Sequence, residues 1–365
     1  MQIQNDNEGM TLALEWAAKG MTSTAPNPRV GCVIVRDGVV IGAGHTQPPG
    51  QAHAEIEALR DAAARGHEVR GATAYVTLEP CNHFGRTPPC SDALVRAGLG
   101  RVVAAIEDPN PLVAGQGLAK LAAHGIATRT GVLAHEAYEL NIGFFSRMRR
   151  GLPWVRMKTA ASIDGGTALH NGVSQWITGA EARADGHAWR ARAGVILTGI
   201  GTVKSDDPQM TVRATDSLRQ PQRVIVDSRL DISLDARILA GEPCWIVAAR
   251  PEAGRVRALQ AAGHEVLLLP NADGKVDLPA LMRELGRREI NEVHVEAGSK
   301  LNGSLIREGC VDELLVYLAP CLLGTAQGMF SLGPYDALEQ RQQLAFHQVQ
   351  QIGADLRILA RFTAD

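Results

Sequence analysis

One histidine and two cysteines stand at spacings that suit a metal site. His53 lies at the start of an expected helix, Cys81 just beyond an expected strand at 72–78, and Cys90 at the start of the next helix. A neutral imidazole and two thiolates are good zinc ligands, and three protein ligands leave a fourth position for water. The positive end of a helix also favours the thiolate form of cysteine. The spacing therefore predicts one catalytic Zn²⁺ per chain.

Glu55 is the residue that we expect to move protons at this metal. It stands two residues after His53, so the two share no helix face and Glu55 is a poor fourth ligand. If His53 caps the helix, Glu55 lies beside the water of the metal. Zinc lowers the pKa of that water to about 7, which yields hydroxide at neutral pH. A neighbouring carboxylate can take the proton and pass it to a leaving amine, which makes Glu55 the predicted catalytic residue.

The motifs around these residues resemble those of the cytidine deaminase superfamily, which combines His-x-Glu with a later Pro-Cys pair. The cysteines here are separated by eight residues instead of two. That spacing, with Thr-Leu-Glu-Pro-Cys at 77–81, Gly-Arg-Thr-Pro-Pro-Cys at 85–90 and Pro-Asn-Pro-Arg-Val-Gly-Cys at 26–32, resembles the deaminase domain of the bifunctional riboflavin biosynthesis enzymes of bacteria. The resemblance implies that Asn27 holds the substrate. We expect His83 and Arg86 to contact its 5-phosphate.

A second interpretation of the same cluster is a purely structural zinc. Such a site needs a fourth protein ligand, and His45 or His83 could supply it. Cys32 lies within an apolar strand and is expected to belong to the core.

The second half of the chain places polar residues in otherwise apolar surroundings. They gather at 158–165, 174–178, 198–213 and 296–302. Glycine-containing turns follow the expected strands at 195–198 and 293–296, where free N–H groups and a helix dipole suit a pyrophosphate. The third glycine of the dinucleotide-binding fingerprint is missing, so these turns do not indicate a Rossmann fold.

In this order and spacing the segments resemble the reductase domain of the same riboflavin enzymes, which is similar in fold to dihydrofolate reductase. The resemblance implies that NADPH is contacted by Ala161, Trp176, Thr202, Asp206, Ser228, Gly298, Ser299, Lys300, Leu301, Asn302, Gly303 and Ser304. It implies that the sugar phosphate faces Lys158, Ser174, Arg190, Met210, Arg213 and Glu296. Lys158 and Glu296 are also the candidates for acid–base help in ring opening. Gly166 departs from the family, which usually has a basic residue there.

The length of 365 residues predicts two domains, because a single core rarely grows beyond about 250–300 residues. A basic stretch followed by Gly151 and Pro153 sets the boundary, which gives a zinc-dependent deaminase domain at 1–150 and an NADPH-dependent reductase domain at 151–365. Alternating strands and helices predict an α/β fold in both. The first domain is expected to be a three-layer α/β/α domain like cytidine deaminase, and the second an α/β domain like dihydrofolate reductase.

The composition of the chain limits which binding partners and which cellular location we expect. The net charge of −2 argues against general affinity for nucleic acid or anionic membranes. The sequence contains neither a secretory signal nor an apolar segment long enough to span a bilayer, so we expect a cytoplasmic protein. Six cysteines are too few for a disulfide scaffold in a chain of this length. The resemblance implies a homo-oligomer, a dimer or tetramer, that assembles through the reductase domain.

The two resemblances together imply a bifunctional enzyme whose first domain deaminates 2,5-diamino-6-ribosylamino-4(3H)-pyrimidinone 5′-phosphate and whose second domain reduces the ribosyl group to ribityl. One alternative is a nucleic-acid or nucleoside deaminase with a divergent second domain. Another is a zinc-stabilised binding or regulatory protein with a decayed reductase half.

Overall fold

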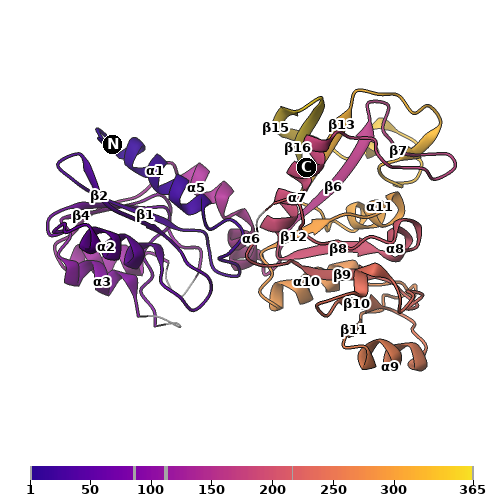
Figure 1. Ribbon diagram of the computed structural model, residues 1–365, viewed down its shortest axis with the longest axis horizontal. Coiled ribbons are helices and arrows are strands. Elements are labelled where there is room, and N and C mark those ends of the chain that lie inside the picture. The colour runs from indigo at the N-terminus through magenta and orange to yellow at the C-terminus, as the bar shows by residue number, and fades with distance from the viewer. Residues whose placement is uncertain (1, 85–87, 111–113, 216, 364–365) are drawn as a thin grey trace. The chain divides into compact units, whose positions relative to one another are not determined.

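Alternating strands and helices build two units, residues 1–151 and 152–365 (Figure 1). The computed structural model describes all residues except 1, 85–87, 111–113, 216 and 364–365. Both units are α/β, as the sequence predicts. Every helix among the described residues is too short or too polar to cross a lipid bilayer.

The first unit contains a five-stranded sheet of order β2-β1-β3-β4-β5. β1 pairs antiparallel with β2 and β3, whereas β3, β4 and β5 run parallel. The strands are β1 (Gly31–Arg36), β2 (Val39–His45), β3 (Thr73–Val76), β4 (Arg101–Ala104) and β5 (Ala127–Arg129). The helices are α1 (Asp6–Ala18), α2 (Ala54–Ala64), α3 (Cys90–Ala97), α4 (Gln116–Ala123), α5 (Ala134–Leu140) and α6 (Ile142–Arg150).

Side chains that alternate along β1 fill two different cores, because successive residues of a strand point to opposite faces of the sheet. Cys32 and Ile34 pack in a cluster with residues of α2, α3, α4 and α6. Val33 and Val35 pack in a second cluster with residues of α1 and α5. The unit therefore has the three layers that the sequence predicts, and Cys32 lies in its core.

The segment between residues 134 and 150 forms two consecutive helices, α5 and α6. The chain breaks at Asn141, which is 1% exposed. Its side-chain amide accepts the N–H of Arg29 at 2.7 Å and donates to the carbonyl of Arg29 at 2.9 Å. The Asn141 side chain thus forms both backbone hydrogen bonds of Arg29, just before β1, in the way that a neighbouring strand forms them.

The second unit contains a nine-stranded sheet of order β11-β10-β9-β8-β12-β6-β13-β16-β15 and a separate pair, β14-β7. The strands of this sheet from β11 to β13 run parallel to one another. β16 runs antiparallel to both of its neighbours, β13 and β15. The strands are β6 (Trp154–Ser162), β7 (Gly166–Leu169), β8 (Val195–Gly199), β9 (Gln222–Val226), β10 (Trp245–Ala248), β11 (Glu265–Leu268), β12 (Glu292–Val295), β13 (Glu313–Ala319), β14 (Ala326–Gly328), β15 (Leu344–Ile352) and β16 (Asp355–Phe362).

Helices cover both faces of this sheet (Figure 1). On β13, Leu314 and Val316 pack in the cluster that includes α10 and α11, while Leu315 and Tyr317 pack with α7. The helices are α7 (Ala180–Arg192), α8 (Ile200–Asp206), α9 (Ala253–Ala261), α10 (Leu278–Arg287) and α11 (Ser299–Arg307), with 3-10 turns η1 (Arg237–Leu239) and η2 (Leu338–Gln340). This arrangement leaves the carboxyl ends of the parallel strands open, where ligands bind in α/β sheets.

Candidate functional sites

A cleft of about 1150 Å³ lies at the carboxyl ends of the parallel strands in the second unit. Gly199 at the end of β8, Ser228 beyond β9 and Ala297 beyond β12 line it. A smaller hollow of about 330 Å³ shares Lys158, Trp176 and several other lining residues with the cleft. The sequence predicts turns at the ends of several strands. In the structure these turns line one continuous binding region.

The helix α11 points its N-terminus into the cleft. Its N-cap, Gly298, supplies no side chain that could occupy the first backbone N–H groups. Gly298 and Thr202 are neighbours, because a Cβ on Gly298 would lie 3.9 Å from the Thr202 hydroxyl. Free N–H groups and the positive helix end suit the pyrophosphate of a dinucleotide, so these residues fit NADPH.

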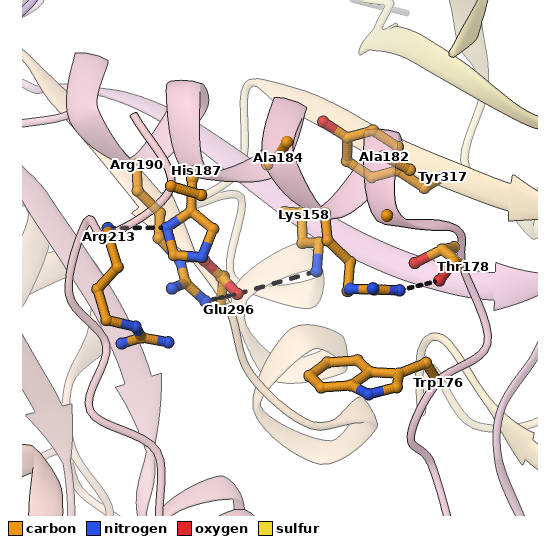
Figure 2. A pocket seen from close by; sticks show the side chains of 14 residues that line it. Lys158, Trp176, Thr178, Ala182, Ala184, His187, Arg190, Arg213, Glu296 and Tyr317 are labelled. Carbon is orange, nitrogen blue, oxygen red and sulfur yellow. Dashed lines mark hydrogen bonds and ion pairs between the residues drawn. The ribbon is translucent and has the colours of Figure 1, made fainter. Parts of the chain in front are cut away.

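The carboxylate of Glu296 contacts two cationic side chains in the smaller hollow (Figure 2). Both carboxylate oxygens accept from the Arg190 guanidinium, and Lys158 Nζ lies 3.9 Å from Oε2. Burial alone would raise the pKa of Glu296, but Arg190 and Lys158 together hold it well below its usual range. Glu296 is therefore an ionised hydrogen-bond acceptor and a poor proton donor.

Arg213 adds a cation that has no acidic partner among the described residues. Its guanidinium donates to Gln209 and Thr211, and its backbone N–H donates to His187 Nδ1 at 3.3 Å. With Lys158 and Arg190 against the single carboxylate of Glu296, the hollow carries net positive charge. Such a hollow suits a phosphate.

Most of the reductase residues predicted from sequence line the cleft. Those that do are Lys158, Ser174, Trp176, Arg190, Thr202, Asp206, Met210, Arg213, Ser228, Glu296, Gly298, Ser299, Lys300, Leu301 and Asn302. Three others, Ala161, Gly303 and Ser304, are not among the residues that line the cleft. Ala161 is fully buried, Gly303 packs on the Ser331 backbone, and the Ser304 hydroxyl accepts from Arg307.

Gly166 lies in β7 at a position with no room for a side chain. A Cβ there would lie 2.7 Å from the Ala326 side chain on the paired strand β14 and 3.2 Å from the Leu323 side chain. The absence of a basic residue at this position is therefore tied to the close approach of the two strands.

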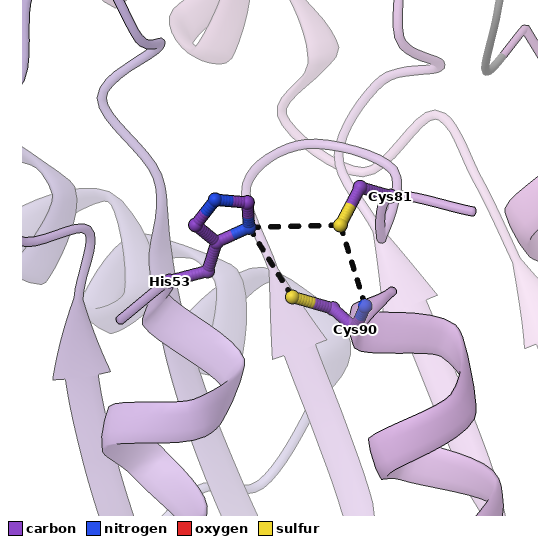
Figure 3. A group of neighbouring side chains, drawn as sticks. All are labelled: His53, Cys81 and Cys90. Carbon is purple, nitrogen blue, oxygen red and sulfur yellow. Dashed lines mark hydrogen bonds between the residues drawn. The ribbon is translucent and has the colours of Figure 1, made fainter. Parts of the chain in front are cut away.

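His53, Cys81 and Cys90 come together at the start of two helices (Figure 3). His53 is the N-cap of α2, Cys90 is the first residue of α3, and Cys81 lies in the loop that follows β3. His53 Nδ1 lies 3.6 Å from Cys81 Sγ and 3.3 Å from Cys90 Sγ. Nitrogen and sulfur ligands of a tetrahedral zinc lie about 3.6 Å apart, so the three atoms fit this metal.

The two thiols differ in acidity. Hydrogen bonds from the Cys90 thiol and the His53 ring lower the pKa of Cys81 to about 4. The contact with Cys81, followed by burial, raises the pKa of Cys90. The lowered pKa favours the thiolate form of Cys81, the form in which cysteine binds metals.

Glu55 lies in the first turn of α2, next to these ligands, and is 3% exposed. Burial and then the negative charge of Cys81 raise its pKa to about 7. His53 caps the helix, which is the condition under which the sequence predicts Glu55 to be a neighbour of the metal's water. A carboxyl group with such a pKa can both accept and donate a proton near neutral pH.

Glu79 shapes this site, and the sequence analysis gave it no role. Its buried carboxylate accepts four backbone N–H groups, from Asp108, Gly115, Gly117 and Leu118, at 2.8–3.2 Å. These bonds tie the loop after β4 and the start of α4 to the strand end that carries Cys81. The sequence signal that could have identified Glu79 is its position directly before Pro-Cys at the end of a strand.

Asp108 also lies near the cluster of His53, Cys81 and Cys90, and the sequence analysis did not single it out. Burial raises its pKa to about 6, and the negative charges of Glu79 and Cys81 act in the same direction.

The three residues predicted to hold the deaminase substrate lie in loops. Asn27 lies in the segment before β1, and its side chain makes no hydrogen bond to a described residue. His83 Nδ1 is buried and also has no hydrogen-bond partner within the described structure. Arg86 lies outside the described residues.

Comparison with known proteins matches both halves of the chain to known families. Residues 3–106 match the cytidine and deoxycytidylate deaminase zinc-binding region, and residues 153–358 match the RibD C-terminal domain. The riboflavin biosynthesis protein RibD of Escherichia coli is 44% identical over 96% of this chain and 98% of its own length. The chain belongs to the RibD family. RibD of Acinetobacter baumannii shares its fold with a TM-score of 0.89 and 41% identity, over 98% of this chain and 99% of that one.

A second solved relative is the deaminase and reductase of Thermotoga maritima, which is 31% identical with a TM-score of 0.88 over 98% of this chain and 99% of that one. As a RibD family member, the chain is a bifunctional deaminase and reductase of riboflavin biosynthesis that uses Zn²⁺ and NADPH. The predictions of family, fold class, function and cofactors are confirmed. The match across the second unit does not favour a nucleic-acid or nucleoside deaminase.

Proposed function

We propose that residues 1–150 remove an exocyclic amine of 2,5-diamino-6-ribosylamino-4(3H)-pyrimidinone 5′-phosphate and that residues 151–365 then reduce its ribosyl group to ribityl. The observation that carries the proposal is the presence in one chain of a His-Cys-Cys cluster beside a buried glutamate and of a cation-lined cleft at strand ends. The Thermotoga maritima relative is described as a diaminohydroxyphosphoribosylaminopyrimidine deaminase and a 5-amino-6-(5-phosphoribosylamino)uracil reductase, which supports this substrate and this order.

In the deaminase site, His53, Cys81 and Cys90 would hold the zinc ion. When bound, zinc would supply a Lewis acid that makes water a nucleophile at neutral pH. Glu55 would take a proton from the attacking water and deliver it to the exocyclic nitrogen, while the water oxygen bonds to the ring carbon. The C–N bond breaks and ammonia leaves. The raised pKa of Glu55 is compatible with both transfers.

We assign Asn27, His83 and Arg86 to binding of this substrate. The orphaned Nδ1 of His83 supports the assignment, because a buried nitrogen without a partner costs free energy that a ligand can recover. A phosphate oxygen is a suitable partner.

In the reductase site, the N-terminus of α11 with Gly298 to Asn302 would hold the pyrophosphate of NADPH, and Trp176, Thr202, Asp206 and Ser228 would contact the rest of the cofactor. NADPH supplies the hydride that is transferred to the anomeric carbon of the sugar. Ala161, Gly303 and Ser304 would act through their backbone or by shaping the wall behind the ligand.

Arg190, Arg213, Ser174 and Met210 would hold the sugar phosphate. Lys158 would donate the proton to the ring oxygen as the sugar ring opens. Glu296 is ionised against Arg190, so its role would be to orient Lys158 and accept a hydrogen bond from a sugar hydroxyl.

The proposal is tested with the purified chain and the diaminopyrimidine ribosyl phosphate. We expect ammonia release without NADPH, and NADPH oxidation that follows ammonia release when both are present. NADPH oxidation that precedes ammonia release would reverse the order. Ammonia release from cytidine or tRNA, but not from this compound, would contradict the substrate.

We further propose a homo-oligomer, a dimer or tetramer, that assembles through the reductase domain. β15 is an edge strand of the nine-stranded sheet and leaves Phe346 76% exposed and Val349 55% exposed. Such an edge favours pairing with another chain. Light scattering is expected to give a multiple of the 39.0 kDa chain mass, and Val349→Lys is expected to shift the population towards monomer. A monomeric wild-type protein would contradict the proposal.

A further inference from the structure

His187 lies in the reductase site, although no sequence signal singled it out. It precedes Arg190 by three residues on α7, so the two side chains share a helix face. Its ring lines the smaller hollow together with Lys158, Arg213 and Glu296 (Figure 2).

One hydrogen bond fixes the tautomer of this ring. His187 Nδ1 faces the backbone N–H of Arg213 at 3.3 Å and can only accept from it. In a neutral imidazole the other nitrogen then carries the proton, so Nε2 is a donor. Nε2 lies on the opposite edge of the ring from Arg213, towards the interior of the hollow in Figure 2. It makes no hydrogen bond to any residue that the structure describes.

The charges around the ring keep it neutral. Arg190 faces it from α7, Arg213 from the segment after α8, Lys158 from β6, and Glu296 from the end of β12. Burial, followed by the repulsion of these cations, lowers the pKa of His187 to about 4 against the opposing effect of Glu296. At neutral pH the ring therefore offers one N–H in a fixed direction.

The other donors of the hollow are already engaged. Arg190 is paired with Glu296 through two hydrogen bonds, and Lys158 lies beside the same carboxylate. The Arg213 guanidinium donates to neutral oxygens of Gln209 and Thr211. The Nε2–H of His187, by contrast, has no acceptor among the described residues, and it lies in a hollow whose net charge is positive.

We propose that His187 is a further substrate-binding residue of the reductase site, whose Nε2–H donates to a phosphate oxygen of the phosphorylated sugar. The inference rests on the proposed function, because it takes this hollow as the sugar phosphate site. It adds a neutral donor to the charged groups assigned there. Arg213 thus contributes twice, with its guanidinium and with the backbone N–H that orients the imidazole.

Ribose 5-phosphate is the probe, and its affinity for the full chain with NADP⁺ bound is measured by calorimetry. His187→Leu is expected to weaken binding by about 10- to 100-fold, the loss expected for a hydrogen bond to a charged group. His187→Gln is expected to restore most of the affinity, because its amide oxygen can accept from Arg213 while its NH₂ donates to the phosphate. His124→Leu, at an exposed position of the first unit, is the matched control and should bind as wild type does.

A nitrogen spectrum of the histidine rings gives a readout that a merely structural role would not change. We expect the His187 signals, identified by their loss in His187→Gln, to show the Nε2–H tautomer at neutral pH. Ribose 5-phosphate should shift the Nε2 signal. NADP⁺ affinity of His187→Leu should equal that of wild type, which reports that the cleft is intact.

Two results would overturn the proposal in distinguishable ways. Unchanged affinity of His187→Leu for ribose 5-phosphate, or an Nδ1–H tautomer, would remove His187 from the binding site and leave the proposed reductase function intact. A wild-type chain that binds NADP⁺ but not ribose 5-phosphate would overturn the sugar phosphate site and the role of His187 with it.

Discussion

The two sites of this chain are built in opposite ways. The zinc cluster is compact: three ligand atoms lie within 4.8 Å of one another, and Glu55 is buried beside them. The reductase cleft is wide, and its lining comes from several strand ends, two helix starts and the loops between them. The first site depends on residue types at a few positions. The second depends on the shape of the backbone and on charge spread over many side chains.

This difference predicts how each site responds to substitution. In the proposed mechanism the deaminase site relies on one carboxylate, so removal of Glu55 is expected to abolish almost all deamination. Each binding contact in the cleft is one of many, so removal of a single binding contact is expected to lower the reductase activity only in part.

The largest expected effect is that of Glu55→Gln. The amide cannot carry protons, and loss of general acid–base catalysis lowers rates by about 10²- to 10⁴-fold. Ammonia release should fall by this factor, while zinc content and NADPH oxidation with the deaminated substrate stay at wild-type levels. Loss of both activities in a folded variant would contradict the independence of the sites.

The next effect is on stability and comes from Glu296→Gln. The substitution leaves the partly buried Arg190 without its carboxylate, which costs about 3 kcal/mol in comparable buried pairs. Unfolding in urea is followed by tryptophan fluorescence, because Trp154, Trp176, Trp189 and Trp245 all lie in the second unit.

The pH dependence of this effect has a definite sign. The pKa of Glu296 is lowered in the folded chain, so the carboxylate stabilises the fold above its unfolded value of 4.5, and this stabilisation is lost as the pH falls further. The difference between wild type and Glu296→Gln should therefore be largest at neutral pH and shrink in acid. A difference that grows in acid would contradict the assignment of an ionised Glu296.

A graded effect is expected for Arg213→Ala. Removal of one phosphate contact should raise the KM of the reductase by about 10- to 100-fold, with a smaller change in kcat. Arg229→Ala, an exposed cleft-lining position paired with Asp231, serves as the control for loss of a nearby charge. An unchanged KM in Arg213→Ala would place the phosphate elsewhere.

The smallest effect is expected for Gly166→Lys, which introduces the basic residue usual in the family. The new side chain collides with Ala326 and Leu323, and overpacking of this kind costs about 1–3 kcal/mol. The melting temperature of the second unit should fall while the deaminase rate stays the same. A variant as stable as wild type would mean that β7 and β14 can separate at little cost.

The contrast between a compact cluster and a wide cleft also explains how much of each site could be predicted from the sequence. His53, Glu55, Cys81 and Cys90 lie within 38 residues, and their types suit one metal, so residue chemistry alone predicted the cluster that the structure brings together. The predicted residues that line the cleft extend from Lys158 to Asn302, and they become a site only when parallel strands align their ends. Resemblance to a family was needed to find them, because single arginines and glycines have many other uses.

Two residues that we assign to the sites were not predicted, for different reasons. Glu79 accepts backbone N–H groups from a loop that follows a different strand, which no local pattern encodes. His187, which we propose as a substrate contact, was not singled out, and its spacing of three residues before Arg190 on a helix gains meaning only once Arg190 is assigned to the site. β15 carries little strand signal in the sequence, because it is exposed along most of its length and lacks the regular alternation of apolar and polar residues that marks a half-buried strand.

The most direct test of two independent sites in one chain is complementation between variants. Glu55→Gln and Lys158→Gln chains are each incubated with the diaminopyrimidine ribosyl phosphate and NADPH, singly and mixed, while ammonia and NADPH are followed. We predict that Glu55→Gln alone oxidises little NADPH, that Lys158→Gln alone releases ammonia without oxidising NADPH, and that the mixture does both. Fast NADPH oxidation by Glu55→Gln alone, or a mixture that releases ammonia but still oxidises no NADPH, would contradict the account.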